Sequence, residues 1–189
     1  MSLFFLKRVL ANPARVGYIV PSSRFLTNQT AGFIDFSVDR IVVELGPGEG
    51  CHTRRIAQRL GAGSRLILIE LDHRFAEHLK KQFAHDARVS VVNADALALA
   101  ETLIDLGVSV PDYIVSGIPF TIMPRAPREQ LLTRIADSMG PETRLITYQA
   151  SLQISDHAHF DLVRSKHCLL NVPPLHVMEL RKQSATKKA

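Results

Sequence analysis

The sequence predicts an α/β fold in which a mostly parallel, Rossmann-like sheet is extended by an antiparallel hairpin. After about residue 40, apolar runs of strand length alternate with helical patterns, which is typical of parallel strands joined by helices. The first apolar run ends in a glycine turn that leads directly into a helical pattern. Near the C-terminus, two alternating apolar runs are separated by Asn171-Val-Pro-Pro174, which predicts a hairpin.

Each element follows from its own stretch of sequence. Parallel strands are expected at residues 41–45, 66–70, 89–93, 113–116 and 144–148. Helices are expected at residues 52–60, 73–84 and 128–139. Gly61 is expected to close the first helix, because glycine is common just after a helix C-terminus. Hairpin strands at residues 164–170 and 176–180 bring the predicted sheet to seven strands.

Composition restricts the class of protein. A chain of 189 residues fits one domain, and an apolar fraction of 46% is typical of a globular protein. The net charge of +5 suits an anionic partner, either a membrane surface or a nucleic acid. Two cysteines, Cys51 and Cys168, are too few for a disulfide framework and favour a reducing compartment. Because Lys7 and Arg8 interrupt any signal peptide and no apolar run could span a bilayer, we expect a cytoplasmic location.

The glycine turn follows an acid. The segment Ile41-Val-Val-Glu-Leu-Gly-Pro-Gly-Glu-Gly50 places three glycines between a strand and a helix, where bare backbone can approach a ligand closely. Glu44 at the end of the strand would repel a phosphate, but it suits a cation or a hydroxyl group. A ligand without phosphate is therefore favoured.

Two further acids follow the next two strands. Glu70 lies twenty residues past Gly50, where an acid in a doubly wound fold can reach ribose hydroxyls. The same feature would serve NAD, but Cys51 stands where the third glycine of a dinucleotide motif would be. Asp95 ends the third strand and is the other candidate acid of the ligand site; the alternative is that it only caps a helix.

Together these residues resemble the cofactor site of class I S-adenosylmethionine (SAM) methyltransferases. SAM carries a sulfonium and an ammonium but no phosphate, which fits Glu44, and in those enzymes an acid at the position of Asp95 meets the adenine amine. The resemblance implies SAM as cofactor. The candidate cofactor-binding residues are Glu44, Gly46, Gly48, Gly50, Glu70, Leu71, Asp95, Ala96 and Ser116.

The loop after the fourth strand is expected to line the acceptor pocket, because ligands bind at the carboxyl ends of such strands. Its sequence, Ser116-Gly-Ile-Pro-Phe120, is similar to the Asn-Leu-Pro-Tyr type of loop in adenine-N6 methyltransferases. Gly117 stands in place of the Asn that would hold an adenine amine, while Pro119 keeps the proline. Phe120 could face an ammonium group, or it could be a core residue. Tyr148 is expected to contact the amine, with a half-buried strand aromatic as its alternative. The candidate catalytic residues are therefore Gly117, Pro119, Phe120 and Tyr148.

A wider resemblance points to lipid chemistry. Five segments together resemble the small bacterial phospholipid N-methyltransferases: residues 12–23, the glycine turn Glu44-Leu-Gly-Pro-Gly-Glu-Gly50, the Ser-Gly-Ile-Pro-Phe loop, Thr147-Tyr148 and Asn171-Val-Pro-Pro174. That family is similar in fold and motif order to the ribosomal RNA adenine dimethyltransferases. It methylates the amine of phosphatidylethanolamine successively toward phosphatidylcholine, which is the implied function. The candidate substrate-binding residues are Arg15, Tyr18, Ser22, Ser23 and Arg24, and a simple cap and turn is the alternative for Pro21-Ser-Ser.

The N-terminus supports a membrane partner. Leu3, Phe5, Leu6, Val9 and Leu10 share one face of a helical wheel, opposite Lys7, Arg8 and Asn12. Such a basic amphipathic helix can lie in the headgroup plane of an anionic membrane, or it can pack on the domain itself. We therefore expect an N-terminal helix and Pro-Ser-Ser segment at residues 1–24, a methyltransferase domain at 25–182 and a basic tail at 183–189. The protein is expected to be a monomer on the inner face of the bacterial membrane.

Other functions stay open. The alternatives are an RNA adenine-N6 methyltransferase, an ornithine-lipid N-methyltransferase and a non-enzymatic SAM-binding module. The missing Asn at position 117 counts against RNA, so nucleic acid is not the expected partner. His157 and His159 with Asp161 lack a further ligand and methyl transfer needs no metal, so none is expected.

Overall fold

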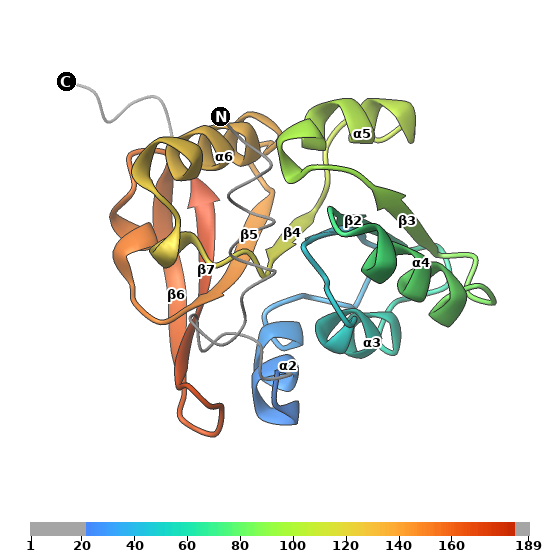
Figure 1. Ribbon diagram of the computed structural model, residues 1–189, viewed down its shortest axis with the longest axis horizontal. Coiled ribbons are helices and arrows are strands. Elements are labelled where there is room, and N and C mark those ends of the chain that lie inside the picture. The colour runs from blue at the N-terminus through green and yellow to red at the C-terminus, as the bar shows by residue number, and fades with distance from the viewer. Residues whose placement is uncertain (1–21, 184–189) are drawn as a thin grey trace.

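The computed structural model describes residues 22–183, and in that range it confirms the predicted sheet (Figure 1). Its seven strands have the order β3-β2-β1-β4-β5-β7-β6. Five are parallel, and β6 and β7 run antiparallel to their neighbours. The strands are β1 (Ile41–Leu45), β2 (Arg65–Glu70), β3 (Val89–Asn93), β4 (Tyr113–Ser116), β5 (Arg144–Gln149), β6 (Phe160–Cys168) and β7 (Leu175–Lys182). Because β1 lies between β2 and β4, the strand order reverses there, and that switch point is where such sheets bind ligands.

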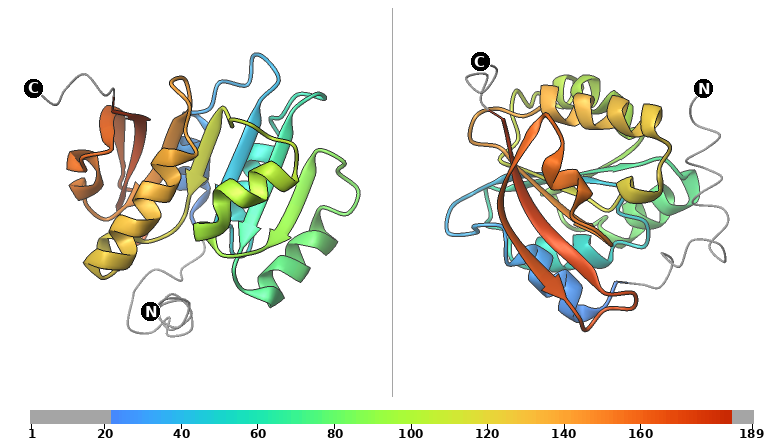
Figure 2. Two further views of the ribbon diagram at one scale, coloured as in Figure 1. Left: turned by 90° about the horizontal axis from the view of Figure 1, so that it is seen from above. Right: turned by 90° about the vertical axis from the view of Figure 1, so that its left-hand side faces the viewer.

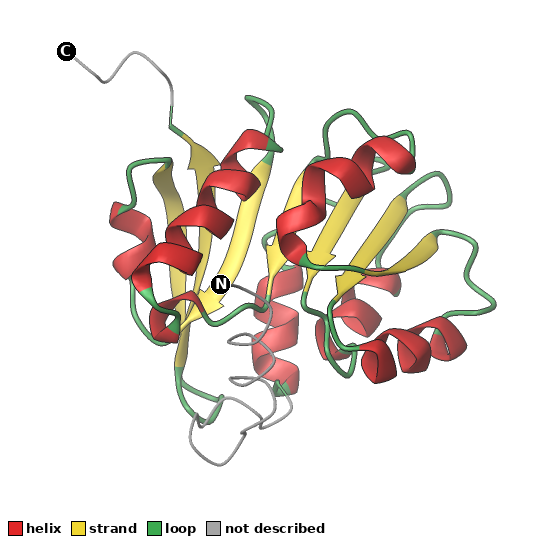
Figure 3. Cartoon of the chain, turned by 45° about the horizontal axis from the view of Figure 1, so that its top comes forward, coloured by secondary structure: helices red, strands yellow, loops and turns green. Residues whose placement is uncertain are grey.

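Helices cover both faces of the sheet (Figure 2). One face packs against α2 (Arg24–Ala31), α3 (Cys51–Ala57) and α4 (His73–Gln82), and the other against α5 (Leu99–Asp105) and α6 (Arg125–Asp137). Short 3₁₀ turns η2 (Ala96–Ala98), η3 (Phe120–Ile122) and η4 (Gln153–Asp156) follow strands β3, β4 and β5 (Figure 3). Alternate strand residues feed two separate apolar clusters, one on each face.

Several predicted boundaries were wrong. Helix α3 ends at Ala57 and is followed by Gln58, so Gly61 does not close it. Gly61 lies instead in the turn before β2, where a side chain would collide with the carboxylate of Asp39. That carboxylate accepts a hydrogen bond from the N–H of Gly63 at 3.1 Å. Gly61 and Gly63 therefore leave space for the Asp39 side chain, which stabilises the turn.

The β6–β7 hairpin turns at the same edge of the sheet as the ligand-binding loops. Gln149, the last residue of β5, pairs with His176, and Cys168 at the end of β6 pairs with Leu175. The connecting loop therefore projects past the carboxyl ends of the parallel strands, beside α2 (Figure 1). None of the helices in residues 22–183 is long and apolar enough to cross a membrane.

Two of the segments that carry the resemblance to the lipid enzymes, Pro21-Ser-Ser and Asn171-Val-Pro-Pro174, meet at Ser23 and Asn171. Asn171 Oδ1 accepts a hydrogen bond from the backbone N–H of Ser23 at 2.9 Å, and its Nδ2 donates to the carbonyl of Pro173 at 2.8 Å. The hairpin loop thus holds the start of α2. The predicted amphipathic helix, Arg15, Tyr18 and the tail from residue 184 lie outside the described residues.

Candidate active site

Three glycines shape the loop between β1 and α3. Gly46, Gly48 and Gly50 have φ values of 66°, 57° and 74°, a left-handed conformation that other residues rarely adopt. A Cβ on Gly50 would also lie 2.8 Å from the Leu79 side chain, whereas one on Gly48 would meet nothing within 4 Å. The middle of the loop therefore presents bare backbone to open space, so a ligand can approach it closely.

Glu70 fastens this loop to the next strand. Its Oε2 accepts a hydrogen bond from the N–H of Gly48 at 2.9 Å, and its Oε1 accepts one from Asp72 at 2.9 Å. Burial raises the pKa of Glu70, and these two backbone donors oppose the rise. Each oxygen keeps a second lone pair, so the carboxylate can still accept hydroxyl groups of a ribose.

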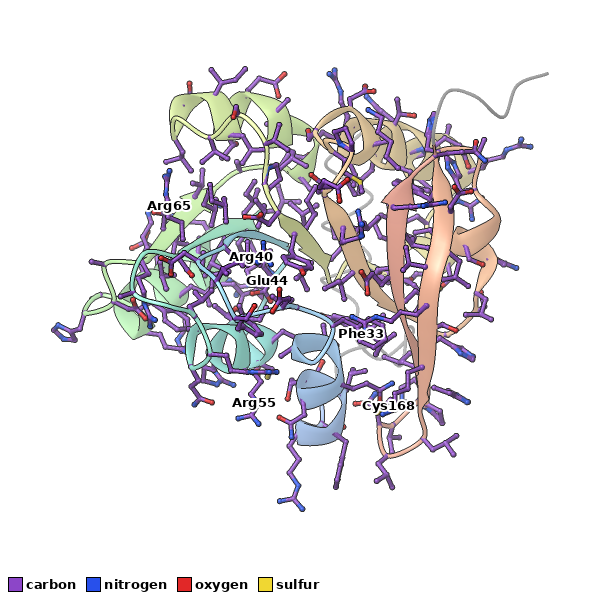
Figure 4. The ribbon with its side chains drawn as sticks, turned by 180° about the vertical axis from the view of Figure 1, so that it is seen from behind. Phe33, Arg40, Glu44, Arg55, Arg65 and Cys168 are labelled. Carbon is purple, nitrogen blue, oxygen red and sulfur yellow. The ribbon has the colours of Figure 1, made fainter. Side chains whose placement is uncertain are left out.

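Glu44 lies beneath the loop, fully enclosed (Figure 4). Thr53, on the first turn of α3, donates its hydroxyl to Glu44 Oε2 at 2.7 Å. Burial raises the pKa of Glu44 to about 7, and the nearby charge of Glu70 adds to the rise. A cationic ligand would favour the ionised form, so this acid is poised to respond to one.

The end of β3 contributes the third acid. Asp95 is half-buried and caps η2 by accepting the N–H of Leu97 at 3.0 Å, which is the alternative role expected for it. Ala96 is buried beside it. Asn93 donates to the carbonyls of Glu70 at 2.8 Å and Leu71 at 3.1 Å, so the strand ends that carry the acids are tied together.

Buried hydrogen bonds from β5 position the loop after β4. Gln149 Nε2 donates to the carbonyl of Ile118 at 2.9 Å and to the hydroxyl of Thr147 at 2.8 Å. Thr147 in turn donates to the carbonyl of Ser116 at 3.2 Å, and Ser116 Oγ accepts the N–H of Ile118 at 3.3 Å. These bonds fix the orientation of the Gln149 amide and leave its Oε1 buried without a partner among the described residues.

Gly117 and Tyr148, both predicted catalytic residues, lie against each other. A Cβ on Gly117 would overlap the hydroxyl of Tyr148 and would lie 3.1 Å from the carbonyl oxygen of Gly46. The tyrosine hydroxyl therefore occupies the space that an asparagine side chain would need. Burial raises the pKa of Tyr148, with Glu44 and Cys51 adding to the rise, so its hydroxyl stays protonated.

His52 is a functional candidate that the sequence analysis missed. Its ring stacks on that of Tyr148, with centroids 4.2 Å apart and planes 9° apart. It is buried, and neither ring nitrogen makes a hydrogen bond to the part of the chain that the structure describes. Burial lowers its pKa to about 3, so the ring is neutral. Its position two residues after the last loop glycine was the only sequence signal available.

The other predicted acceptor-loop residues are more enclosed. Phe120 packs in the apolar core, the alternative expected for it, and borders a cavity of about 320 Å³ beside α6. The carbonyl of Pro119 accepts the N–H of Ile122 at 3.2 Å.

Of the predicted lipid-binding residues, Ser23 caps α2 by accepting a hydrogen bond from the backbone N–H of Leu26 at 3.2 Å, and Arg24 is exposed.

The histidines near η4 have structural partners. His157 Nε2 lies 2.6 Å from Glu129 Oε2, and His159 Nε2 lies 3.1 Å from the Thr133 hydroxyl, so both link η4 and β6 to α6. Within residues 22–183 there is no group of three or more His, Cys, Asp or Glu side chains that could hold a metal ion.

Comparison with known proteins identifies the family. A model of the family described as ribosomal RNA adenine dimethylase matches residues 22–166. The chain belongs to the ribosomal RNA adenine dimethylase family. Family membership makes it a SAM-dependent methyltransferase and confirms the predicted cofactor.

Members of this family and its relatives differ in acceptor. The ornithine lipid N-methyltransferase of Singulisphaera acidiphila is 32% identical over 137 residues, which cover 72% of this chain and 71% of that enzyme. The ribosomal RNA small subunit methyltransferase A of Acidobacterium capsulatum is 41% identical over 87 residues, but the match covers 42% of this chain and only 29% of that enzyme. The lipid enzyme therefore matches this chain over a much larger share of both proteins.

A solved structure confirms the fold. The 1,6-didemethyltoxoflavin-N1-methyltransferase of Burkholderia thailandensis, determined with bound S-adenosylhomocysteine, superposes with a TM-score of 0.68. The two are 15% identical, and the match covers 95% of this chain and 88% of that one. At that identity the likeness concerns the fold alone.

Proposed function

We propose that this methyltransferase acts on the primary amine of a membrane aminolipid. An ornithine lipid is the first candidate acceptor and phosphatidylethanolamine the second. The observation that carries the proposal is the likeness to the ornithine lipid N-methyltransferase over about seven tenths of both chains. Phosphatidylethanolamine, which the sequence resemblance favoured, offers the same primary amine and stays in the proposal as an alternative.

The geometry of the acceptor loop supports an alkyl amine over adenine. At position 117 the side-chain acceptor that holds an adenine amine is absent, and the hydroxyl of Tyr148 takes its space. The Tyr148 ring, stacked on His52, offers a flat aromatic surface against which methylated ammonium products can pack. Gln149, which donates to the carbonyl of Ile118, holds this loop in place from β5.

The chain's residues have separate tasks in this reaction. When bound, SAM supplies an activated methyl group, and Gly48, Glu70, Glu44 and Asp95 are the residues that would hold it. Tyr148 stays protonated, so it can orient the amine but cannot remove its proton. The amine reaches its neutral, nucleophilic form by giving a proton to water, and the enzyme's contribution is alignment of the nitrogen.

An RNA adenine methyltransferase is the second candidate. The family description and the 41% identity to the A. capsulatum enzyme favour it. The short coverage of that enzyme and the crowding at Gly117 count against it.

One competition experiment separates these functions. Purified protein would receive methyl-labelled SAM together with vesicles that contain an ornithine lipid or phosphatidylethanolamine, and with ribosomal RNA in the same tube. We expect label in the lipid extract and none in the RNA. Label confined to the RNA would contradict the proposal, and comparison of the two lipid preparations would identify the acceptor.

A further inference from the structure

The tip of the β6–β7 hairpin exposes large apolar side chains. Leu169, Leu170 and Val172 are 69%, 64% and 74% exposed, and Phe25 on the neighbouring helix α2 is 42% exposed. Single exposed apolar residues are normal on a protein surface, but a cluster of them indicates an interaction site. Here three lie within four consecutive positions of one loop.

This tip projects from the edge of the sheet that carries the active site. Cys168 and Leu175 pair at the base of the loop, and His176 pairs with Gln149 at the end of β5. Figure 4 shows Cys168 beside α2, at the end of the hairpin away from α5 and α6. A flat partner touching the tip would therefore face the acceptor loop.

The segments that form the hairpin tip and α2 contain cationic side chains and no anionic ones. Residues 162–178 and 22–34 contain no Asp or Glu, and they supply the exposed cations Arg24 and Lys166. Arg164 also lies on β6, but it is engaged with Glu179 and with the carbonyl of Phe33. Charge complementarity thus favours an anionic partner.

A groove between α2 and the hairpin is lined by apolar side chains and by a cationic one. It has a volume of about 520 Å³, within the range of ligand pockets, and Phe25, Leu169 and Leu170 line it together with Lys166. Apolar walls with a cation at the rim suit an amphiphile with an anionic head. A phospholipid bilayer, with an apolar layer beneath an anionic surface, offers both characters at one flat face.

We infer that the hairpin tip and the start of α2 form a membrane-docking surface. Leu169, Leu170 and Val172 enter the apolar layer of an anionic phospholipid bilayer, while Arg24 and Lys166 meet its headgroups. This surface is built from other residues than those of the predicted N-terminal amphipathic helix. The inference rests on the proposed lipid function, because docking here would bring the acceptor loop to its substrate.

Vesicle sedimentation of the full chain tests this surface without any methyl transfer. The variant Leu169→Asp/Leu170→Asp is expected to lower partitioning onto phosphatidylglycerol-containing vesicles roughly tenfold or more. Ile104→Asp is the matched control, because Ile104 is 73% exposed on α5, which covers the opposite face of the sheet. Arg24→Glu/Lys166→Glu should weaken binding to these vesicles at low salt and leave binding to phosphatidylcholine vesicles unchanged. S-adenosylhomocysteine binding, measured by calorimetry, checks that each variant is folded.

A second measurement places the tip in the bilayer. The chain contains no tryptophan, so Leu170→Trp introduces a single reporter. Its emission should shift to the blue on anionic vesicles, whereas Ile104→Trp should show no shift. Unchanged sedimentation of the Asp variant, or no shift of the emission from Leu170→Trp, would overturn the inference. So would a change in oligomeric state with unaltered vesicle binding, because the tip would then contact a second copy.

The two proposals can fail separately. Vesicle binding through the tip with no methyl label in lipid would remove the proposed function and keep the docking surface. Methyl label in lipid, together with full vesicle binding by the Leu169→Asp/Leu170→Asp variant, would keep the proposed function and remove the docking surface.

Discussion

Two buried titratable residues near Tyr148 give the folded protein opposite pH dependences. Glu44 has a pKa of about 7, above its ordinary value of 4.5, so the folded state holds a proton that the unfolded state releases. The stability that this proton contributes is present below pH 4.5 and is lost as the pH rises through 7. His52 has a pKa of about 3, below its ordinary 6.5, so its contribution is present above pH 6.5 and is lost as the pH falls.

Glu44→Gln removes the pH dependence of stability that Glu44 causes. The amide keeps an acceptor for Thr53 but cannot ionise, so the variant should gain stability relative to the wild type as the pH rises. We expect a gain of about 2 to 3 kcal/mol between pH 5 and pH 8, measured as the difference in the free energy of unfolding by urea. A difference that does not change with pH would show that Glu44 is not buried as described.

His52→Phe removes the pH dependence of stability that His52 causes, and it keeps an aromatic ring stacked on Tyr148. The variant should gain about 2 kcal/mol over the wild type as the pH falls from 7 to 5. At pH 7 it should be at least as stable as the wild type, because it removes two buried nitrogens that lack partners. Lower stability at every pH would mean that His52 makes hydrogen bonds that the described residues do not show.

Gly117→Ala tests the contact between the acceptor loop and Tyr148. The added methyl group collides with the tyrosine hydroxyl, so we expect a loss of about 1 to 3 kcal/mol in unfolding free energy and a lower methylation rate. Tyr148→Phe on the same background should recover part of the stability. The recovery is partial because the carbonyl of Gly46 also lies 3.1 Å away. If Gly117→Ala is as stable as the wild type, the crowding argument against an adenine-type loop fails.

At the scale of elements, one hydrogen bond links α2 to the hairpin. Asn171→Ala removes the acceptor for the Ser23 N–H and should cost about 1 to 2 kcal/mol. Amide hydrogen exchange in residues 24–31 should become faster, because α2 loses its attachment to the loop. Asn28→Ala, at an exposed asparagine on α2, is the control and should not speed exchange in residues 24–31, because alanine favours a helix. Equal exchange in both variants would contradict this role of Asn171.

Elements with strong patterns were predictable and short ones were not. Strands β1, β2 and β4 are mostly apolar runs buried on both faces, so their sequence signal is clear. Helices α2 and α5 have eight and seven residues, too few to show a helical period, and no helix was predicted for either. β6 was expected to begin at residue 164 but begins at Phe160, because its exposed residues hide the alternation.

Across the whole molecule, the sequence predicted the positions of the three acids assigned to the cofactor site, but not the side chains that surround the acceptor loop. Glu44, Glu70 and Asp95 could be placed because each lies at or just past the carboxyl end of a parallel strand, and such ends meet at one edge. His52 and Gln149 could not be recognised, since their importance depends on contacts with Tyr148 and Ile118 from distant strands and loops. The link between Ser23 and Asn171 likewise joins residues 148 positions apart.

The central claim is that the methyl group goes to a lipid amine. Mass spectrometry of the lipid extract, after incubation of the protein with SAM and aminolipid vesicles, tests it most directly. We predict headgroups heavier by the mass of one or more methylene units, formed by the wild type and much more slowly by Gly117→Ala. Unmodified lipid, together with N6-methylated adenine in ribosomal RNA treated with the same protein preparation, would contradict the account.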